Sequence, residues 1–248
     1  MDRKFVRAVE LTGEIPEDSY LQDVPAVRHL LHGGQLEFNK PVTFLVGENG
    51  TGKSTLLEGI AVACGFNPEG GSRNFSFSTK DTHSGLFGCL RVVRSAYPKD
   101  GFFLRAESLY NAASYIDALD EGVPEPARLS TRYYGGSLHE KSHGESFLAL
   151  VQNRFRGQGL YFLDEPEAAL SPMRQMTLIG EIDRLVREGS QFIIATHSPM
   201  LMAFPGAEVL EITEKGIESV DYRRTEHYQV TRRFLEQPER MLGLLLAE

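Results

Sequence analysis

The fold of this chain is decided by the stretch Gly47-Glu48-Asn49-Gly50-Thr51-Gly52-Lys53-Ser54-Thr55. Its glycines and its Lys-Ser pair have the spacing G-x-x-x-x-G-K-[ST], which is typical of a loop that wraps a polyphosphate. A β-branched, apolar run at 42–46 comes before it and a run suited to a helix at 56–61 follows it, as that motif requires. Such a loop turns its backbone N–H groups inward, and the helix directs its positive dipole end to the same point. All nine residues are therefore predicted to bind the phosphates of a nucleotide.

Two side chains of this stretch have distinct expected roles. Lys53 is expected to reach the β- and γ-phosphate oxygens as a point charge, and the Ser54 hydroxyl is expected to ligate Mg²⁺. The alternative is a glycine-rich turn that happens to precede a helix. Because the bare pattern arises by chance in roughly one per cent of chains of this length, the nucleotide site is the favoured interpretation.

Length and composition indicate a globular protein. The 248 residues allow one large α/β domain or two small ones, and a hydrophobic content of 41% supplies a sizeable core. No apolar run approaches the roughly 18 residues of a transmembrane segment, and residues 1–5 resemble neither a signal peptide nor a lipidation site. A cytoplasmic location is therefore expected.

The segments before the loop predict an antiparallel β layer. Residues 5–11 alternate apolar and polar side chains, as a half-buried strand does. Residues 23–27 are expected to be extended, and a short strand is expected at 36–38. After the loop and its helix, strands are expected at 86–93 and 102–105, joined by a hairpin-like turn, and a helix at 108–119.

Two acidic residues follow an apolar run in the second half of the chain. The run 160–163 precedes Asp164 and Glu165, as a buried parallel strand does when it delivers carboxylates to the edge of a sheet. Asp164 is expected to hold Mg²⁺, directly or through water, and Glu165 to orient or deprotonate an attacking water. The alternative is a simple helix start, since acids and proline suit first turns.

A histidine follows the next predicted strand. An amphipathic helix is expected at 172–186, and the apolar run 191–196 then ends directly before His197. Because ligands of α/β folds bind at the carboxyl ends of strands, His197 is predicted to sense the γ-phosphate. A surface or hydrogen-bonded core histidine is the alternative.

These pieces, in this order, resemble the ATP-binding cassette (ABC) ATPases, and within them a compact, soluble SMC-like branch. The resemblance covers residues 1–212 and rests on five stretches, at 47–55, 141–145, 160–165, 168–172 and 196–199. It implies an α/β P-loop fold with a mixed central sheet, an N-terminal antiparallel β layer and a small helical signature subdomain. It also implies an ATPase in which two chains close around two ATP molecules with Mg²⁺. Residues 1–65 and 157–248 would form the core lobe, and 66–156 an inserted lobe.

In this family a signature segment contacts the γ-phosphate held by the other subunit. The resemblance gives that in-trans role to four residues here, Ser142, His143, Gly144 and Glu145. His143 and Glu145 depart from the usual glycine and glutamine. Independently of the resemblance, Ser142 and Glu145 have the spacing of a capping box for a helix, which is worth about 1 kcal/mol.

Two departures from the family pattern argue against the interpretation that this chain is a transporter subunit. No glutamine occurs between Gln35 and Gln152, so the Q-loop glutamine that helps to bind Mg²⁺ is missing. Its role stays open among Ser78, Thr79, Asp81 and water. Ser171 also stands where many transporters have the aspartate of the D-loop.

The binding partner of the chain and the process that its ATPase activity drives stay open as well. Only 88 positions separate Ser54 from Ser142, without a heptad repeat, which excludes a long coiled-coil arm. An ATP-dependent homodimer is expected. The alternatives are a DNA-associated or defence ATPase that acts through a protein partner, a transporter cassette, and a P-loop kinase. A net charge of −8 gives no general attraction to DNA, although a local basic face on 66–160 stays an alternative.

The tail of the chain predicts two short helices between residues 226 and 246. Its apolar end is expected to pack on the core or to dock a partner, and core packing is the favoured interpretation.

Overall fold

The computed structural model describes residues 4–72, 84–105, 118–136 and 142–246. Up to the signature segment, the chain forms β1 (Val6–Leu11), α1 (Pro25–Leu31), β2 (Leu36–Glu37), β3 (Val42–Val46), α2 (Lys53–Ala63), β4 (Leu90–Arg94), β5 (Asp100–Arg105) and α4 (Leu129–Tyr134). From there it forms α5 (His143–Arg154), β6 (Gly159–Asp164), α6 (Pro172–Arg187), β7 (Gln191–Ala195), α7 (Pro199–Met202), β8 (Glu208–Thr213), β9 (Gly216–Ser219), α8 (Glu226–Glu236) and α9 (Pro238–Leu245).

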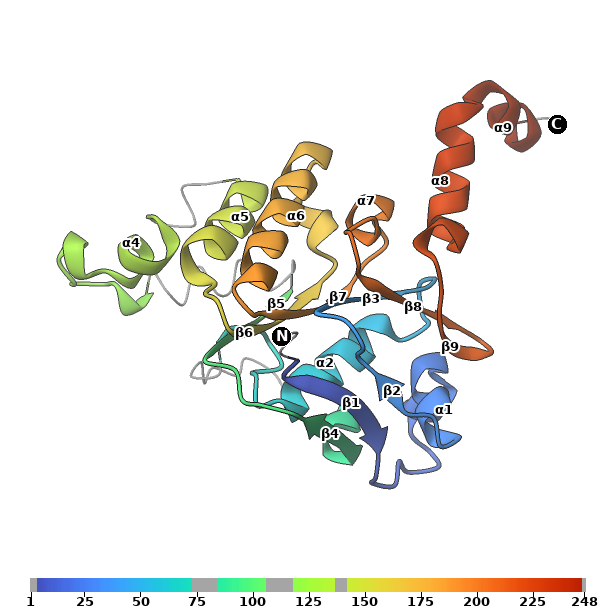
Figure 1. The fold of residues 1–248 in the computed structure, drawn as a ribbon, viewed down its shortest axis with the longest axis horizontal. Coiled ribbons are helices and arrows are strands. Elements are labelled where there is room, and N and C mark those ends of the chain that lie inside the picture. The colour runs from blue at the N-terminus through green and yellow to red at the C-terminus, as the bar shows by residue number, and fades with distance from the viewer. Residues whose placement is uncertain (1–3, 73–83, 106–117, 137–141, 247–248) are drawn as a thin grey trace.

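The strands of the described residues form two sheets. The main sheet has the order β5-β6-β7-β3-β8-β9, in which only the β8-β9 pair is antiparallel. The small sheet has the order β2-β1-β4 and is antiparallel. Figure 1 shows α5, α6 and α7 on one side of the main sheet, and α1, α2 and the small sheet on the other. The predicted mixed central sheet with an N-terminal antiparallel β layer is confirmed.

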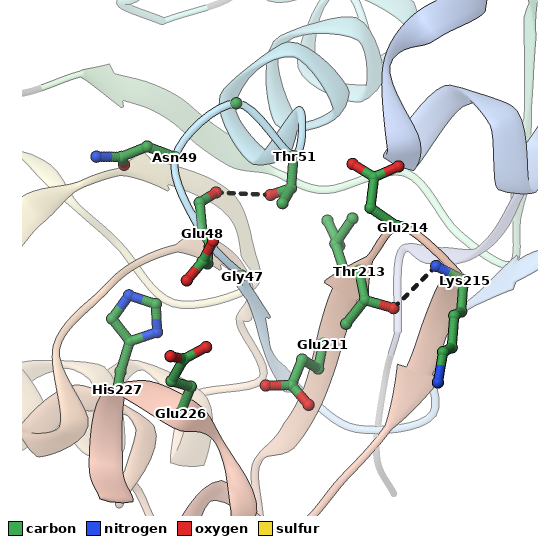
Figure 2. Close-up of a pocket in the computed structure, with 12 residues that line it drawn as sticks. Gly47, Glu48, Asn49, Thr51, Glu211, Thr213, Glu214, Lys215, Glu226 and His227 are labelled. Carbon is green, nitrogen blue, oxygen red and sulfur yellow. Dashed lines mark hydrogen bonds between the residues drawn. The ribbon is translucent and has the colours of Figure 1, made fainter. Parts of the chain in front are cut away.

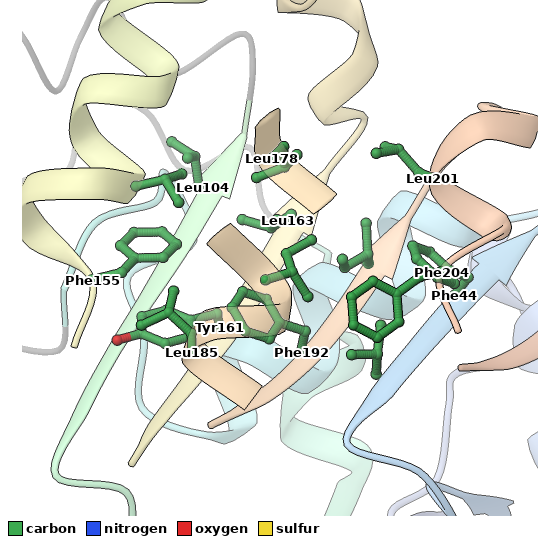
Figure 3. Packing of buried hydrophobic residues seen from close by; sticks show 14 of the residues in the cluster. Phe44, Leu104, Phe155, Tyr161, Leu163, Leu178, Leu185, Phe192, Leu201 and Phe204 are labelled. Carbon is green, nitrogen blue, oxygen red and sulfur yellow. The ribbon is translucent and has the colours of Figure 1, made fainter. Parts of the chain in front are cut away.

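Both faces of the main sheet are buried, and the side chains of each strand alternate between them. In β6, Tyr161 and Leu163 belong to the cluster beneath α5 and α6, whereas Leu160 and Phe162 belong to the cluster on the α2 side. Figure 3 shows the first of these clusters. A parallel strand that is covered on both faces needs a continuous apolar run. For this reason β3, β6 and β7 could be predicted from the sequence.

The side chain of Gln191 ties the small sheet to the main one. It lies at the start of β7 and is completely buried. Its Oε1 accepts hydrogen bonds from the backbone N–H groups of Phe5 (2.7 Å) and Val6 (2.9 Å), and its Nε2 donates to the Val6 carbonyl (2.8 Å). One amide side chain therefore satisfies three backbone groups of the chain entering β1.

Two local predictions were wrong. Residues 23–27 do not form an extended segment. Only Val24 has an extended backbone. Asp23 ends a 3₁₀ turn, and Pro25 begins α1, where its fixed φ suits a helix and its missing N–H costs nothing. The segments 86–93 and 102–105 do not form a hairpin. A 3₁₀ turn occupies Gly85–Cys89, β4 then joins the small sheet, and β5 pairs in parallel with β6. The division into a core lobe and an inserted lobe stays a prediction.

The C-terminal helices form as predicted but do not pack on the core. No residue of α8 or α9 is buried, and Figure 1 shows both helices extending away from the sheet. The exposed apolar side chains include Val230, Phe234, Leu235, Leu242, Leu244 and Leu245. Among the residues that the structure describes, no helix has both the length and the apolar character of a membrane span.

Replacing Gln191 by leucine should destabilise the protein. The change keeps the bulk of the side chain but leaves up to three buried backbone groups without partners, at about 1–3 kcal/mol for each group that water does not reach. We expect a loss of at least about 2 kcal/mol in the free energy of unfolding, measured by urea denaturation. The exposed Gln152 is the matched control, and its change to leucine should stay within about 0.5 kcal/mol. Equal stability of the two variants would contradict this account of the sheet-to-sheet link.

Candidate functional site

The stretch 47–55, called the phosphate loop below, joins β3 to α2. Its backbone has positive φ angles at three positions, which glycine adopts much more readily than other residues. Gly47, Gly50 and Gly52 have φ angles of +149°, +84° and +91°. Space is also limiting, because a Cβ on Gly52 would lie 2.2 Å from Val24 Cγ1 and one on Gly47 would lie 2.5 Å from the Ile212 carbonyl oxygen. The first and last glycines of the motif are therefore required by both conformation and packing.

Lys53 is held inside the loop. Its Nζ donates hydrogen bonds to the carbonyl oxygens of Gly47 and Glu48, each at 2.9 Å. Burial lowers the pKa of this ammonium, although Glu165 and Asp164 act in the opposite direction. A positive charge held by two backbone carbonyls of this loop is positioned to meet a phosphate oxygen.

Ser54 and Asp164 meet although 110 positions separate them in the chain. The Ser54 hydroxyl, in the first turn of α2, donates to Asp164 Oδ1 at 2.8 Å. Asp164 is the last residue of β6 and is almost completely buried. The parallel order β6-β7-β3 brings these two side-chain oxygens together at one edge of the sheet.

Arg105 also reaches this cluster, and the sequence analysis missed it. It ends β5 directly opposite Asp164 in the strand register. Its Nε lies 3.4 Å from Asp164 Oδ2, and its Nη1 lies 2.7 Å from Glu58 Oε2. Because β5 was assigned to a hairpin, its end was not expected at the site. Three candidates for the missing glutamine, Ser78, Thr79 and Asp81, lie outside the described residues.

Glu165 has an unusual backbone for a residue that is not glycine. Its φ and ψ are +47° and +53°, in the left-handed region, and it precedes a 3₁₀ turn at Pro166–Ala169. Its side chain is 43% exposed, so water can reach the carboxylate. A conformation of this kind costs of order 1–3 kcal/mol and is retained where the surrounding structure fixes it.

Glu167 clamps the segment that carries His197, and it is a second residue that the sequence analysis missed. Its carboxylate accepts hydrogen bonds from the Thr196 hydroxyl (2.8 Å) and from the His197 backbone N–H (2.5 Å). Burial raises the pKa of the Glu167 carboxyl, while these two donors oppose that change. The position was present in the Asp-Glu-Pro-Glu sequence, but nothing there indicated which acid faces inward.

His197 lies between Glu165 and a histidine of the C-terminal tail. Its Nδ1 is 2.7 Å from His227 Nε2, and its Nε2 is 3.6 Å from Glu165 Oε1, beyond hydrogen-bond distance. This Nε2 is buried and has no hydrogen-bond partner within the described residues. Burial lowers the pKa of His197, and the charges of Lys53 and His227 lower it further, so the ring is neutral near pH 7.

A cavity of about 560 Å³ adjoins the outer side of the loop. Figure 2 shows that Gly47–Thr51, the β8-β9 segment Glu211–Lys215, Glu226 and His227 line it. Four of these residues are glutamates, which repel phosphate. The phosphate groups are therefore expected at Lys53 and Ser54, and the cavity is a neighbouring space.

The signature segment lies at the start of α5, with the predicted capping box. Ser142 and Glu145 cap each other's backbone. Arg174 of α6 donates to Ser142 Oγ (3.2 Å) and pairs with Glu145 (3.0 Å), and hydrogen bonds from Ser142 lower the pKa of the Glu145 carboxyl. A Cβ on the buried Gly144 would lie 2.7 Å from the Ala169 carbonyl oxygen. The hydrogen bonds described for residues 142–145 do not run to the phosphate loop.

The chain is similar to two AAA-domain family models and to ATP-binding proteins of bacteria. A family model described as "AAA domain" matches residues 27–92, and one described as "AAA domain, putative AbiEii toxin, Type IV TA system" matches residues 143–203. The cobalt import ATP-binding protein CbiO of Salmonella paratyphi A is 29% identical over 189 residues, which cover 71% of this chain and 68% of that protein. The cell division ATP-binding protein FtsE of Mycobacterium tuberculosis is 25% identical over 183 residues, covering 68% and 78%.

A solved structure has the same fold. It is the inward-facing conformation of "a putative metal-chelate type ABC transporter", which is 16% identical. The match covers 93% of this chain and 88% of that one, with a TM-score of 0.50. At this identity the likeness concerns the fold alone.

The change Glu167→Gln should loosen the His197 segment. The amide keeps the size of the side chain but offers one oxygen to two donors, so one buried donor faces an N–H group. We expect a loss of about 1–3 kcal/mol in the free energy of unfolding, measured by urea denaturation. Glu218→Gln, at an exposed position, is the control and should change it by no more than about 0.5 kcal/mol. A Glu167→Gln protein as stable as its control would show that the clamp contributes nothing.

Proposed function

We propose, for a chain that has the P-loop fold of the ABC-type ATPases, that it binds ATP with Mg²⁺ and hydrolyses the γ-phosphate bond when two copies close around two nucleotides. The observation that carries this proposal is the gathering of Lys53, Ser54, Asp164, Glu165 and His197 at one edge of the main sheet. We also propose that the chain belongs to the compact SMC-like branch of these ATPases and that it is located in the cytoplasm.

The chemistry is an in-line attack of water on the γ-phosphate. Glu165 is accessible to water and acts as the base that orients or deprotonates it. Lys53 and the N–H groups of residues 47–55 stabilise the charge that develops on the phosphate oxygens. His197, neutral and close to Glu165, donates a hydrogen bond to the γ-phosphate.

The residues present fit a magnesium ion. Mg²⁺ prefers hard oxygen ligands and usually takes only one or two from the protein, with the rest from phosphates and water. The Ser54 hydroxyl and the Asp164 carboxylate supply these two, 2.8 Å apart. When bound, the ion neutralises charge on the β- and γ-phosphate oxygens.

The signature segment acts in trans in this proposal. Ser142 and Gly144 start a capped helix, whose N-terminus suits an anion. Because the hydrogen bonds described for this segment run to Arg174 and within itself, it is assigned to the nucleotide of the second copy. Arg174 and Glu145 hold Ser142 in place for that contact.

Two alternative cellular functions would use the same hydrolysis of ATP. A transporter cassette is favoured by the likeness to import ATP-binding proteins, and it predicts co-purification with a membrane protein. An ATP-switched defence or DNA-associated ATPase that acts through a protein partner is favoured by the match to the toxin–antitoxin model. It predicts ATPase stimulation by duplex DNA that falls steeply with salt concentration.

The change Glu165→Gln should abolish hydrolysis and retain ATP binding. Removing the base should slow phosphate release by at least about a hundredfold, while the loop that binds ATP is untouched. Phosphate release and nucleotide binding are measured on the same preparations, with Glu218→Gln as the control that keeps the wild-type rate. ADP and free phosphate are the expected products. Wild-type turnover by Glu165→Gln, or transfer of phosphate to another acceptor as in a kinase, would contradict the proposal.

A further inference from the structure

We propose that His227, in the first turn of α8, is a positioning residue that fixes the tautomer of His197 and so completes the hydrolysis site with the C-terminal helix. The inference rests on the proposed function in one respect, since it uses the phosphate-sensing role of His197. The contact between the two rings does not depend on that role. His227 lies 30 positions after His197, on an element that the motifs of the ATP site do not include.

One hydrogen bond joins the two rings. His197 Nδ1 and His227 Nε2 are 2.7 Å apart, with ring centroids 4.7 Å apart and planes at 54°. Two nitrogens at this distance make a hydrogen bond only when one carries a hydrogen and the other is an acceptor. Because His197 is buried and near Lys53, its ring is neutral, so it carries a hydrogen on one nitrogen only.

The surroundings of His197 favour one tautomer, and a donor at its Nδ1 fixes it. Its Nε2 faces the Glu165 carboxylate at 3.6 Å, where a nitrogen lone pair would be repelled and an N–H is attracted. Because this contact is too long for a hydrogen bond, the carboxylate alone leaves both tautomers populated. The hydrogen bond at 2.7 Å decides between them: with His227 Nε2 as the donor, His197 Nδ1 is the acceptor and His197 Nε2 carries the hydrogen. This is also the tautomer that His197 needs to donate a hydrogen bond to a phosphate oxygen. His227 thus acts on the nucleotide through His197.

The anchoring of α8 fits this purpose. The helix buries no residue of its own, so packing on the core does not explain where it begins. Its first turn is fixed instead by Thr225, which is completely buried, accepts from the Tyr228 N–H (3.4 Å) and donates to the Tyr222 carbonyl (2.7 Å). Tyr222 and Tyr228 add an edge-on contact with centroids 5.3 Å apart. Figure 2 shows the result, in which His227 faces the phosphate loop across the cavity.

Two substitutions separate positioning from simple packing. His227→Leu keeps much of the bulk and removes the donor, whereas His227→Gln places an amide N–H where the Nε2–H of the histidine lies. His32→Leu is the control, because His32 is an exposed histidine at the end of α1, on the other side of the main sheet. A role in packing alone predicts that Leu and Gln behave alike.

The first readout is steady-state ATP hydrolysis by the full-length protein. We expect His227→Leu to lower kcat by about tenfold to a hundredfold, as loss of an orienting partner does elsewhere, with a smaller effect on KM. His227→Gln should recover most of kcat, and His32→Leu should match the wild type. Wild-type kcat in His227→Leu, or equal losses in the Leu and Gln variants, would overturn the inference.

The second readout needs no turnover, so it tests the inference even if the proposed function fails. Nitrogen-15 NMR of histidine-labelled protein without nucleotide reports which ring nitrogen carries the hydrogen, and His197→Gln identifies the signal. The expected result is the Nε2–H tautomer in the wild type and in His227→Gln, and a mixture of tautomers in His227→Leu. An Nδ1–H tautomer in the wild type, or no change in His227→Leu, would overturn the inference. Absence of ATP hydrolysis by the wild type would count against the proposed function alone.

Discussion

Parallel pairing of β6, β7 and β3 is the constraint on which the rest of the site depends. Each strand ends at the same edge of the sheet, so the loop after β3, the acids after β6 and the histidine after β7 meet there without any direct sequence proximity. The strands are covered on both faces by apolar clusters, which hold their ends in register. A shift of one strand by one residue would move its buried side chains to the other face, so the geometry at the edge is tied to the packing of the core.

Polar side chains that are buried or partly buried then fix the segments next to the sheet. Gln191 fixes the chain entering β1, and Glu167 fixes the backbone of His197. Arg105 holds Asp164 beside Ser54 through an ion pair at the end of β5. Each of these groups is expensive to leave unpaired in a dry interior, so each restricts the neighbouring segment to one arrangement.

The sequence predicted the elements whose pattern is continuous and missed those that depend on tertiary partners. Glycine spacing, apolar runs and capping residues act within a few positions of the chain. They therefore predicted the phosphate loop, β6, β7 and the capping box at Ser142. The pairing of β5 with β6 was not, since its apolar run fits a hairpin as well, and Arg105 was therefore missed. His227 was missed because a histidine on an amphipathic tail helix carries no signal until the fold places it beside His197. In the tail, the hydrophobic pattern predicted the two helices but not where their apolar side chains lie. The apolar side chains of α8 and α9 are exposed, although they were expected to pack on the core.

The central claim is that each ATP site is shared between two copies, and a mixing experiment tests it most directly. Glu165→Gln lacks the base, and Ser142→Asp keeps a good helix cap while its charge repels the phosphate that the segment is proposed to contact. Each variant alone should be inactive. In an equal mixture about half of the dimers are mixed, and each mixed dimer has one intact site, so we expect about a quarter of the wild-type rate. A mixture no faster than its separate components would contradict the shared site.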